Sequence, residues 1–241
     1  YQETIDICNE ILVTDINSIA AIKLIAKSFL AIRKIDDARL YFNKALKIKS
    51  DDYEVIKDLG NTYQAIGDIN TAKNHYQKAV DINSSYAPAL TNLGIIELNN
   101  GNQENALSLL LKASECDPLL IPAWVNLANV YLKLNKLDEA ERSTRKAIAL
   151  NPNLADAHYN LGNILIANGK ISESETSLRN AIALNPNIAE AHLSLGGIFK
   201  ERGELNQAEI STRKAIKIND NIARSHNNLG IILKELGKLK E

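Results

Sequence analysis

Residues 156–170 have the sequence DAHYNLGNILIANGK, and closely similar strings stand 34 residues before and 34 residues after them. Residues 122–136 are PAWVNLANVYLKLNK, and residues 190–204 are EAHLSLGGIFKERGE. The side chains change between these copies while the spacing stays constant. Such a period indicates one small structural unit that is copied many times and stacked on itself.

A frame of 34 residues that starts at Ile19 continues through the chain without a shift. It predicts one array over residues 1–241. The array consists of a half repeat (second helix) at 1–18, six full repeats at 19–52, 53–86, 87–120, 121–154, 155–188 and 189–222, and a half repeat (first helix) at 223–241. Positions within a repeat are numbered from 1 to 34 below.

Each repeat contains two amphipathic segments. Positions 4, 7, 8 and 11 form the apolar stripe of a first helix, and positions 20, 24, 27 and 28 form that of a second helix. Small residues at positions 8, 20 and 27 allow the two backbones to approach closely, because a larger side chain would force them apart. Position 8 holds Ala26, Gly60, Gly94, Ala128, Gly162, Gly196 and Gly230.

The turn between the two helices carries glycine in most repeats. The residues at position 15 include Gly67, Gly101, Gly169, Gly203 and Gly237. Glycine adopts a left-handed backbone conformation without strain, so these residues predict a C-cap at the end of each first helix.

The whole pattern resembles the tetratricopeptide repeat (TPR) family. The resemblance rests on the 34-residue period, Leu-Gly at positions 7 and 8, alanine at positions 20 and 27, aromatic residues at position 11 and proline at position 32. It covers the whole chain and implies an all-α, right-handed alpha-solenoid (superhelix) of helix-turn-helix units. It also implies a protein–protein interaction scaffold. In this family an extended peptide or a partner helix binds a concave groove, which is lined by positions 2, 5, 6, 9, 12 and 13.

Asparagine recurs on the expected wall of this groove. Position 6 carries Asn92, Asn126, Asn160 and Asn228, and position 9 carries Asn61, Asn129 and Asn163. A carboxamide both donates and accepts hydrogen bonds, so a spaced row of them can pair with the backbone of an extended peptide of any sequence. The row is similar to the asparagine ladder in the repeat region of O-linked N-acetylglucosamine transferases. Asparagine also suits a solvated inner face in recently duplicated repeats, and the sequence leaves this alternative open.

A second pattern resembles the carboxylate clamp with which some members of the family hold an acidic chaperone C-terminus. Lys57, Asn61 and Asn92 match three of its parts, so Lys57 joins the expected peptide-binding residues. Pro122 and Asn126 stand where the clamp requires lysine and arginine. The electrostatic part of carboxylate recognition is therefore much reduced.

The third repeat differs from the others on its second helix. Leu107 and Leu111 occupy positions 21 and 25, where the other repeats carry charged or amide side chains. Leucines on the convex surface would form an apolar patch for self-association or for a partner, although scattered surface leucines are also common. The same repeat has Glu97 at the usually aromatic position 11, and the pattern does not explain it.

No catalytic set and no metal site are predicted. His158, His192 and His226 occupy position 4 of consecutive repeats. Equivalent helices in a stack lie about 8 to 10 Å apart, too far to share an ion that needs bonds of about 2.0 to 2.1 Å. We expect these histidines to pack at the helix interface. Cys8 and Cys116 fall at core positions of different repeats, so we predict that this segment is not an enzyme and binds no cofactor.

Composition limits the kinds of partner. The formal net charge is -1, so we expect no general attraction to nucleic acid or to acidic membranes. No apolar run approaches the roughly 20 residues that span a bilayer. The expected partner is a protein or peptide of unknown identity, with possible weak self-association through apolar patches or the ends of the array.

The chain starts at Tyr1 and contains no methionine, so we expect it to be a segment of a longer protein. Two cysteines without a disulfide pattern favour a reducing compartment, and we expect a cytoplasmic location. The alternative function is the substrate-docking TPR arm of a larger transferase, similar to a glycosyltransferase, whose catalytic domain lies outside this segment.

Overall fold

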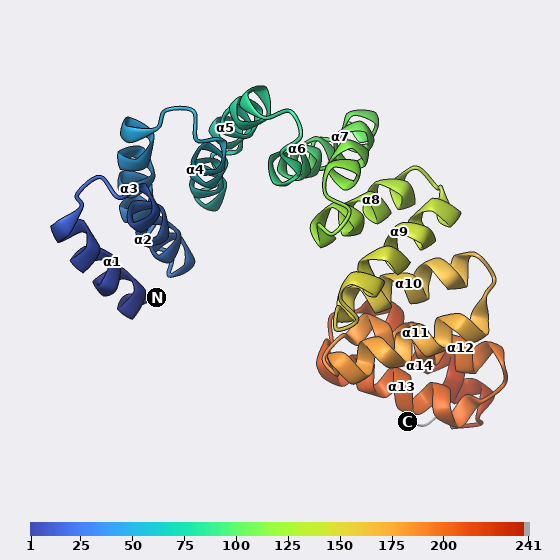
Figure 1. Cartoon of the computed structure of the whole chain (residues 1–241). Helices are drawn as coiled ribbons and strands as arrows, with labels where there is room; N and C mark the ends of the chain where they lie inside the picture. The colour runs from blue at the N-terminus through green and yellow to red at the C-terminus, as the bar shows by residue number, and fades with distance from the viewer. Residues whose placement is uncertain (239–241) are drawn as a thin grey trace. The chain divides into compact units, whose positions relative to one another are not determined.

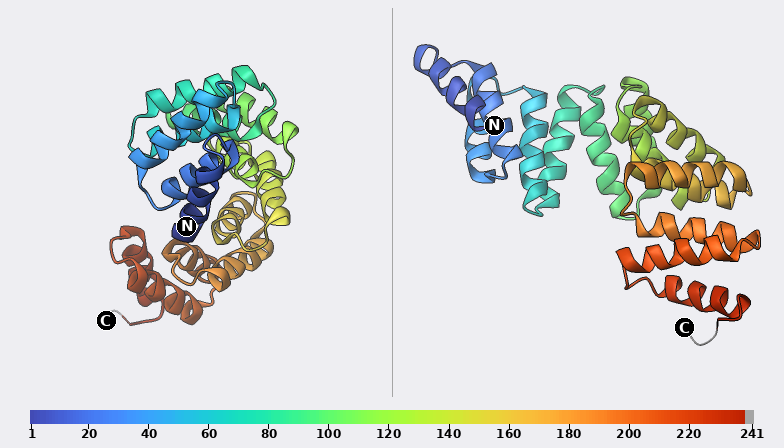
Figure 2. Two further views of the ribbon diagram at one scale, coloured as in Figure 1. Left: turned by 60° about the vertical axis from the view of Figure 1, so that its left-hand side comes forward. Right: turned by 90° about the horizontal axis from the view of Figure 1, so that it is seen from below.

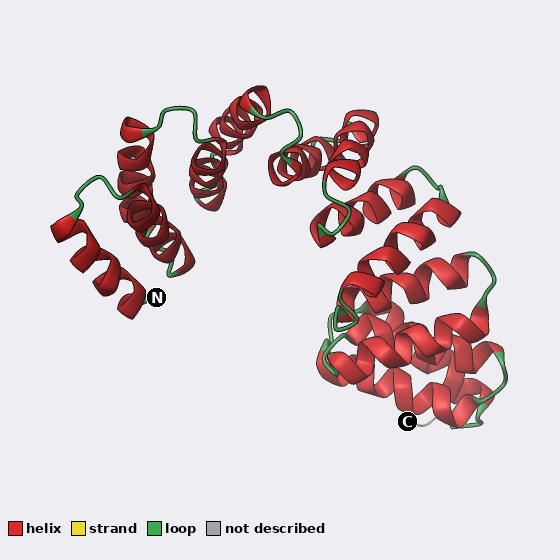
Figure 3. Cartoon of the chain, in the orientation of Figure 1, coloured by secondary structure: helices red, strands yellow, loops and turns green. Residues whose placement is uncertain are grey.

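The computed structural model describes residues 1–238. Within that range every regular element is an α-helix, and short loops and turns connect the helices (Figure 3). The helices labelled in Figure 1 are α1 (Gln2–Thr14), α2 (Ile19–Ala31), α3 (Ile35–Ile48), α4 (Tyr53–Ala65), α5 (Ile69–Ile82), α6 (Ala87–Asn99), α7 (Gln103–Cys116), α8 (Ile121–Lys133), α9 (Leu137–Leu150), α10 (Ala155–Ala167), α11 (Ile171–Leu184), α12 (Ala189–Glu201), α13 (Leu205–Ile218) and α14 (Ala223–Glu235). The predicted all-α fold is confirmed.

The contacts within the chain fall into two compact units. Residues 1–126 form the N-terminal unit and residues 127–241 form the C-terminal unit, with the boundary inside α8. In each unit, helices that follow one another in the chain pack side by side (Figure 2). The most extensive contacts join α2 with α3, α4 with α5, α6 with α7, α10 with α11, and α12 with α13. The predicted division into repeats and the handedness of the array stay predictions.

Each unit buries apolar side chains that the helical stripes contribute. In the N-terminal unit, Ile22, Phe42 and Leu59 belong to one buried cluster that joins α2, α3 and α4. In the C-terminal unit, Leu178, Ala208 and Ile232 belong to a cluster that joins α11, α12, α13 and α14. The second helix α3 therefore packs both on α2 before it and on α4 after it, which buries its apolar stripe along two sides.

Small residues at position 8 allow the two helices of a repeat to make contact. A Cβ atom on Gly94 would lie 2.7 Å from Leu110 Cγ, and one on Gly162 would lie 2.7 Å from Leu178 Cγ. Leu110 and Leu178 both occupy position 24 and are fully buried. The large side chain of the second helix thus fills the space that the missing side chain of the first helix leaves. The predicted close approach of the helices is confirmed at these positions.

The first helices end in a left-handed residue, as the glycines at position 15 predict. Their φ angles lie between 72° and 84° at Gly67, Gly101, Gly169, Gly203 and Gly237. Two repeats use other residues in the same conformation, Arg33 with φ 60° and Asn135 with φ 55°. The next N–H then bonds back to the carbonyl at position 11, for example from Lys170 N to Leu165 O at 2.8 Å. This bond is the long-range bond of a Schellman motif.

Ring nitrogens at position 4 bind the loop before the helix. His158 Nε2 lies 2.9 Å from Pro152 O, and His192 Nε2 lies 3.0 Å from Pro186 O. Trp124 and His226 make the same contact with the carbonyl six residues earlier. A carbonyl can only accept, so each histidine carries its proton on Nε2. Among residues 1–238 no group of three or more metal-ligating side chains is close enough to hold an ion.

None of the helices in residues 1–238 has both the length and the apolar character required to cross a membrane.

Two glycines on first helices are expected to respond in opposite ways to alanine. Gly94→Ala should lower the free energy of unfolding by about 1–3 kcal/mol, because the new methyl group overpacks against Leu110. Gly197→Ala should raise it by about 0.5–1 kcal/mol, because its Cβ meets no atom within 4 Å and alanine is favoured inside a helix. Urea unfolding followed by circular dichroism measures both. Equal effects of the two substitutions would contradict the packing described for position 8.

The left-handed position allows a second comparison. Gly203→Ala should destabilise the chain by about 1 kcal/mol through backbone strain alone, because its Cβ would meet nothing within 4 Å. Arg33→Gly should have the opposite sign, since glycine removes the same strain at φ 60°. Unfolding midpoints in urea check both signs. A destabilising Arg33→Gly would show that the arginine side chain contributes more than the strain it causes.

Candidate functional site

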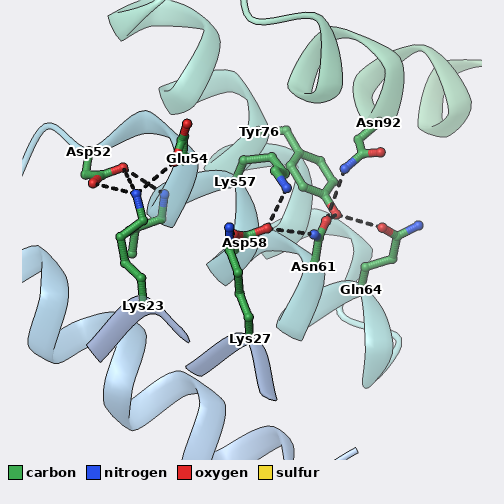
Figure 4. Close-up of polar contacts among 11 residues, drawn as sticks. Lys23, Lys27, Asp52, Glu54, Lys57, Asp58, Asn61, Gln64, Tyr76 and Asn92 are labelled. Carbon is green, nitrogen blue, oxygen red and sulfur yellow. Dashed lines mark hydrogen bonds and ion pairs between the residues drawn. The ribbon is translucent and has the colours of Figure 1, made fainter. Parts of the chain in front are cut away.

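The first helices of the N-terminal unit carry a cluster of charged and amide side chains (Figure 4). Lys23 on α2 reaches the start of α4, where its Nζ lies 3.1 Å from Asp52 Oδ2 and 2.8 Å from Glu54 Oε2. Burial lowers the pKa of Lys23, but its hydrogen bonds to Glu54 and Asp52 outweigh burial and raise the pKa overall. Asp52 also caps α4 by accepting a hydrogen bond from Val55 N. The ion pairs of Lys23 with Asp52 and Glu54 thus join two consecutive first helices.

A second acidic side chain, Asp58, lies deeper in the same cluster. It is 5% exposed. Lys57 Nζ lies 2.5 Å from Asp58 Oδ1, and Asn61 Nδ2 donates to the same oxygen at 3.3 Å. Lys27, one repeat earlier, places its Nζ 3.5 Å from Asp58 Oδ2. The carboxylate is therefore surrounded by two ammonium groups and one amide.

The asparagine row continues from this cluster to the next first helix. Asn92 Nδ2 on α6 donates to Asn61 Oδ1 on α4 at 3.1 Å. Tyr76 Oη, from α5, lies 2.8 Å from the same oxygen and 2.6 Å from Gln64 Oε1. Burial raises the pKa of Tyr76, so its hydroxyl is protonated near neutral pH and acts as a donor. Asn61 is thus held by side chains from three helices, and its Oδ1 atom in turn orients Asn92.

The first helices of the C-terminal unit enclose two hollows. One, of about 390 Å³, is lined by residues of α10, α12 and α14 together with Ile222, which precedes α14. The other, of about 260 Å³, is lined by the same three helices. The residues that line both are Asn163, Leu193, Ser194 and Arg224. Because they share these walls, the two hollows are neighbouring parts of one surface, here called the C-terminal hollow.

The hydrogen bond between consecutive first helices recurs in the C-terminal hollow. Ser194 Oγ donates to Asn163 Oδ1 at 3.1 Å. It joins position 9 of one repeat to position 6 of the next, as the pair Asn61–Asn92 does in the N-terminal unit. The carbonyl oxygen of Asn163 is therefore engaged within the protein, and its Nδ2 group is the end of the amide that can donate a further hydrogen bond. The hydrogen bond from Ser194 therefore leaves the NH₂ end of the Asn163 side chain, and not its carbonyl end, available for another contact.

The other asparagines of the predicted row have different surroundings. Asn126 Nδ2 donates to Pro122 O of its own helix at 2.8 Å, so this amide is partly used by the backbone. Asn228 lines the C-terminal hollow. Asn129 and Asn160 are half-buried and do not line it. The structure thus brings Asn163 and Asn228 to one surface with Ser194, and Asn61 and Asn92 to another.

Sequence reasoning on the amides missed the apolar part of the C-terminal hollow. Tyr159 and Leu193 both line it and both occupy position 5. Position 5 was expected on the groove wall, so an apolar residue there was the available signal. Gly197, at position 9, also lines the hollow, and a Cβ atom on it would meet nothing within 4 Å. This glycine leaves open space in the wall where other repeats have a side chain.

In the fourth, fifth and sixth repeats the second helices carry ion pairs between positions 21 and 25. Glu141 binds Arg145 of its own helix at 3.0 Å and Lys170 of the next repeat at 2.9 Å. The equivalent contacts are Glu175 with Arg179 and Arg202, and Glu209 with Arg213 and Lys238. Leu107 and Leu111 stand at these two positions in the third repeat. Leu107 is half-buried and Leu111 is 36% exposed, so the predicted apolar patch stays a prediction.

Glu97, which the repeat pattern left unexplained, is buried with two partners. Lys73 Nζ lies 2.5 Å from Glu97 Oε1, and Asn102 Nδ2 donates to Oε2 at 2.6 Å. These hydrogen bonds, from Lys73 first and Asn102 second, hold the pKa of Glu97 below its ordinary value of 4.5. Lys73 belongs to the preceding repeat, so the carboxylate of Glu97 joins two consecutive repeats by an ion pair.

Comparisons with known proteins agree with this fold. The chain is a TPR protein by the arrangement of its helices and by its repeat pattern. Residues 44–241 match the family described as Cilia and flagella-associated protein 70 C-terminal domain, and the chain belongs to that family. The predicted TPR solenoid is thereby confirmed. No curated protein matches the sequence.

Solved structures show the same fold at low sequence identity. A chain of the APC/C hetero-tetramer Cut9-Hcn1 matches 96% of this chain over 46% of its own length, with 16% identity and a TM-score of 0.77. The chain therefore spans just under half the length of that relative. PilF of Pseudomonas aeruginosa matches 87% of this chain over 95% of its own length, with 19% identity and a TM-score of 0.79.

YrrB, which is described as a TPR protein with an unusual peptide-binding site, matches 77% of this chain over 96% of its own length. Its identity is 22% and its TM-score is 0.67. Neither the matched family nor these three structures is described as a glycosyltransferase. The similarity of the asparagine row to the ladder of O-linked N-acetylglucosamine transferases thus stays a sequence-based prediction.

The ion pair of Glu97 predicts a specific dependence of stability on pH. Because the pKa of Glu97 is lower in the folded chain, its contribution is complete above the unfolded value of about 4.5 and is lost as pH falls through the folded pKa. Glu97→Gln should therefore cost about 1 kcal/mol at pH 7 and progressively less below pH 4.5. Urea unfolding at a series of pH values measures this difference.

Glu115→Gln, on the exposed side of α7, is the matched control and should shift stability little at any pH. A constant difference between Glu97→Gln and the parent chain from pH 7 to pH 3 would mean that the ion pair does not form in solution.

Proposed function

We propose that this chain is a protein-interaction module and that the C-terminal hollow binds an extended peptide of a partner protein. The observation that carries the proposal is that two adjoining hollows share Asn163, Leu193, Ser194 and Arg224 on consecutive first helices. A concave surface that combines apolar walls with a few convergent polar groups is the usual form of a binding site.

The chemistry of the hollow suits a peptide backbone. Asn163 offers its Nδ2 group to a backbone carbonyl, because Ser194 already occupies its Oδ1. Asn228, one repeat beyond Ser194, offers a second amide on the same surface. Tyr159 and Leu193 supply apolar walls for a side chain of the ligand. Amides would then fix the backbone while the apolar walls select side chains.

The N-terminal unit offers a related but distinct surface. Asn61 and Asn92 repeat the bond between positions 9 and 6, although Asn61 uses both ends of its amide within the protein. We propose that Asn92 is the residue of this pair that contacts a ligand, and that Asn61 orients it. Contacts of Asn126, Asn129 and Asn160 with a ligand stay predictions from the sequence.

The test fills the hollow without disturbing the helix. Gly197→Leu places a large side chain in the open space of the C-terminal hollow. Peptides would first be selected on the intact chain from a displayed random library, and the affinity of one selected peptide would then be measured by calorimetry. We expect Gly197→Leu to weaken binding at least tenfold, which is about 1.4 kcal/mol.

Gly230→Leu is the matched control. Gly230 also lies in a first helix, a Cβ atom on it also meets nothing within 4 Å, and it does not line the C-terminal hollow. This variant should bind the selected peptide as tightly as the parent chain. Circular dichroism confirms that both variants keep their helices. If the selected peptide binds Gly197→Leu with unchanged affinity, the hollow is not the binding site.

A further inference from the structure

Asp58 occupies the centre of a shell that is built to hold a carboxylate. Its Oδ1 atom accepts hydrogen bonds from Lys57 Nζ at 2.5 Å and from Asn61 Nδ2 at 3.3 Å. Lys27 Nζ lies 3.5 Å from Oδ2 (Figure 4). Ammonium and amide donors that converge on one point are the groups with which proteins recognise carboxylates. Here the carboxylate belongs to the protein itself.

Lys23, Lys27, Lys57 and Asp58 all differ from the residues that the remaining repeats carry at the same positions. Position 6 is neutral in the other repeats, and Asp58 is its only charged residue. Position 5 is lysine only at Lys23 and Lys57, and position 9 is lysine only at Lys27. The three lysines and the acid therefore occur on the same two neighbouring first helices and not elsewhere on the inner wall positions 5, 6 and 9.

The carboxylate of Asp58 is not fully hydrogen-bonded. Within residues 1–238, its buried Oδ2 atom has no hydrogen-bond donor and only the longer ion pair with Lys27. A carboxylate can accept about four hydrogen bonds, and buried oxygens are usually satisfied. Lys27 is also half exposed, with 49% of its side chain accessible. The lysines thus compensate the charge of Asp58, but the shell does not supply all the hydrogen bonds that its carboxylate can accept.

We propose that Asp58 is a built-in occupant of a carboxylate-binding site and that it excludes acidic ligands from the inner face of α2, α4 and α6. A tethered carboxylate one residue from Lys57 and three residues from Asn61 has a far higher effective concentration than a free one. An arriving carboxylate would also meet a buried like charge. Asp58 is accordingly a specificity-determining residue, and this proposal does not depend on the C-terminal hollow.

The test removes the internal carboxylate and supplies an external one. The probe is the tripeptide acetyl-Ala-Leu-Gly with a free C-terminal carboxylate, and its C-terminal amide is the neutral comparison. Binding to the full chain is followed by NMR through the side-chain NH₂ signals of Asn61 and Asn92. We expect Asp58→Asn to bind the carboxylate form at least tenfold more tightly than the parent chain does, and to show no such gain for the amide form.

Asp52→Asn is the matched control. It makes the same change in net charge on the same face, removes a partner of Lys23 instead, and keeps a residue that can cap α4. This variant should bind the carboxylate probe no better than the parent chain. An equal gain in Asp52→Asn would show a general charge effect and would overturn the proposal.

A purely structural role of Asp58 gives a different result. Asp58→Asn would then be less stable in urea and would still fail to bind the carboxylate probe, and that outcome would also overturn the proposal. If Asp58→Asn does not keep the helical circular dichroism of the parent, Asp58→Ser replaces it, because the smaller side chain leaves the shell of Lys27, Lys57 and Asn61 vacant. If Asp58→Ser binds the carboxylate probe no more tightly than the parent chain does, the proposal is likewise overturned.

Discussion

The close approach of the two helices in each repeat is the constraint on which the rest of the structure depends. It requires a small residue at position 8 of the first helix, which faces a buried residue at position 24 of the second, as at Gly94 with Leu110. When position 20 departs from alanine, the contact is kept by a specific bond, because Ser174 Oγ donates to Gly162 O at 2.7 Å. Close packing sets the angle of each helix pair, and that angle fixes which residues face inward.

Those inward residues differ between the two units. In the N-terminal unit the cluster around Lys23, Asp52 and Asp58 is charged and internally paired. In the C-terminal unit the equivalent surface has Leu193 and Gly197, and it is hollow. One backbone frame thus carries two chemically different surfaces, because inner-wall positions contribute little to the packing between helices and are free to vary.

The fold could be predicted from the sequence because periodic small and large residues report packing directly. The left-handed turn at position 15 was predicted from glycine in the same way, but the same conformation at Arg33 and Asn135 was not predicted. The candidate site was predicted only in part. A row of asparagines indicates which face is polar, but the partner of each amide depends on rotamers, as Asn126 bonded to Pro122 O shows. Glu97 is paired with Lys73 of another repeat, and a comparison of single positions between repeats does not reveal such a pair.

The ion pairs of the second helices have a consequence for how such a chain can evolve. Glu141 meets Lys170, Glu175 meets Arg202 and Glu209 meets Lys238, so each link joins a repeat only to its immediate successor. Stability in such an array is approximately a sum over nearest neighbours. Duplication or loss of one such repeat would therefore carry its connecting charges with it, and the array could change length by whole repeats while the inner face of each remaining repeat kept its own chemistry.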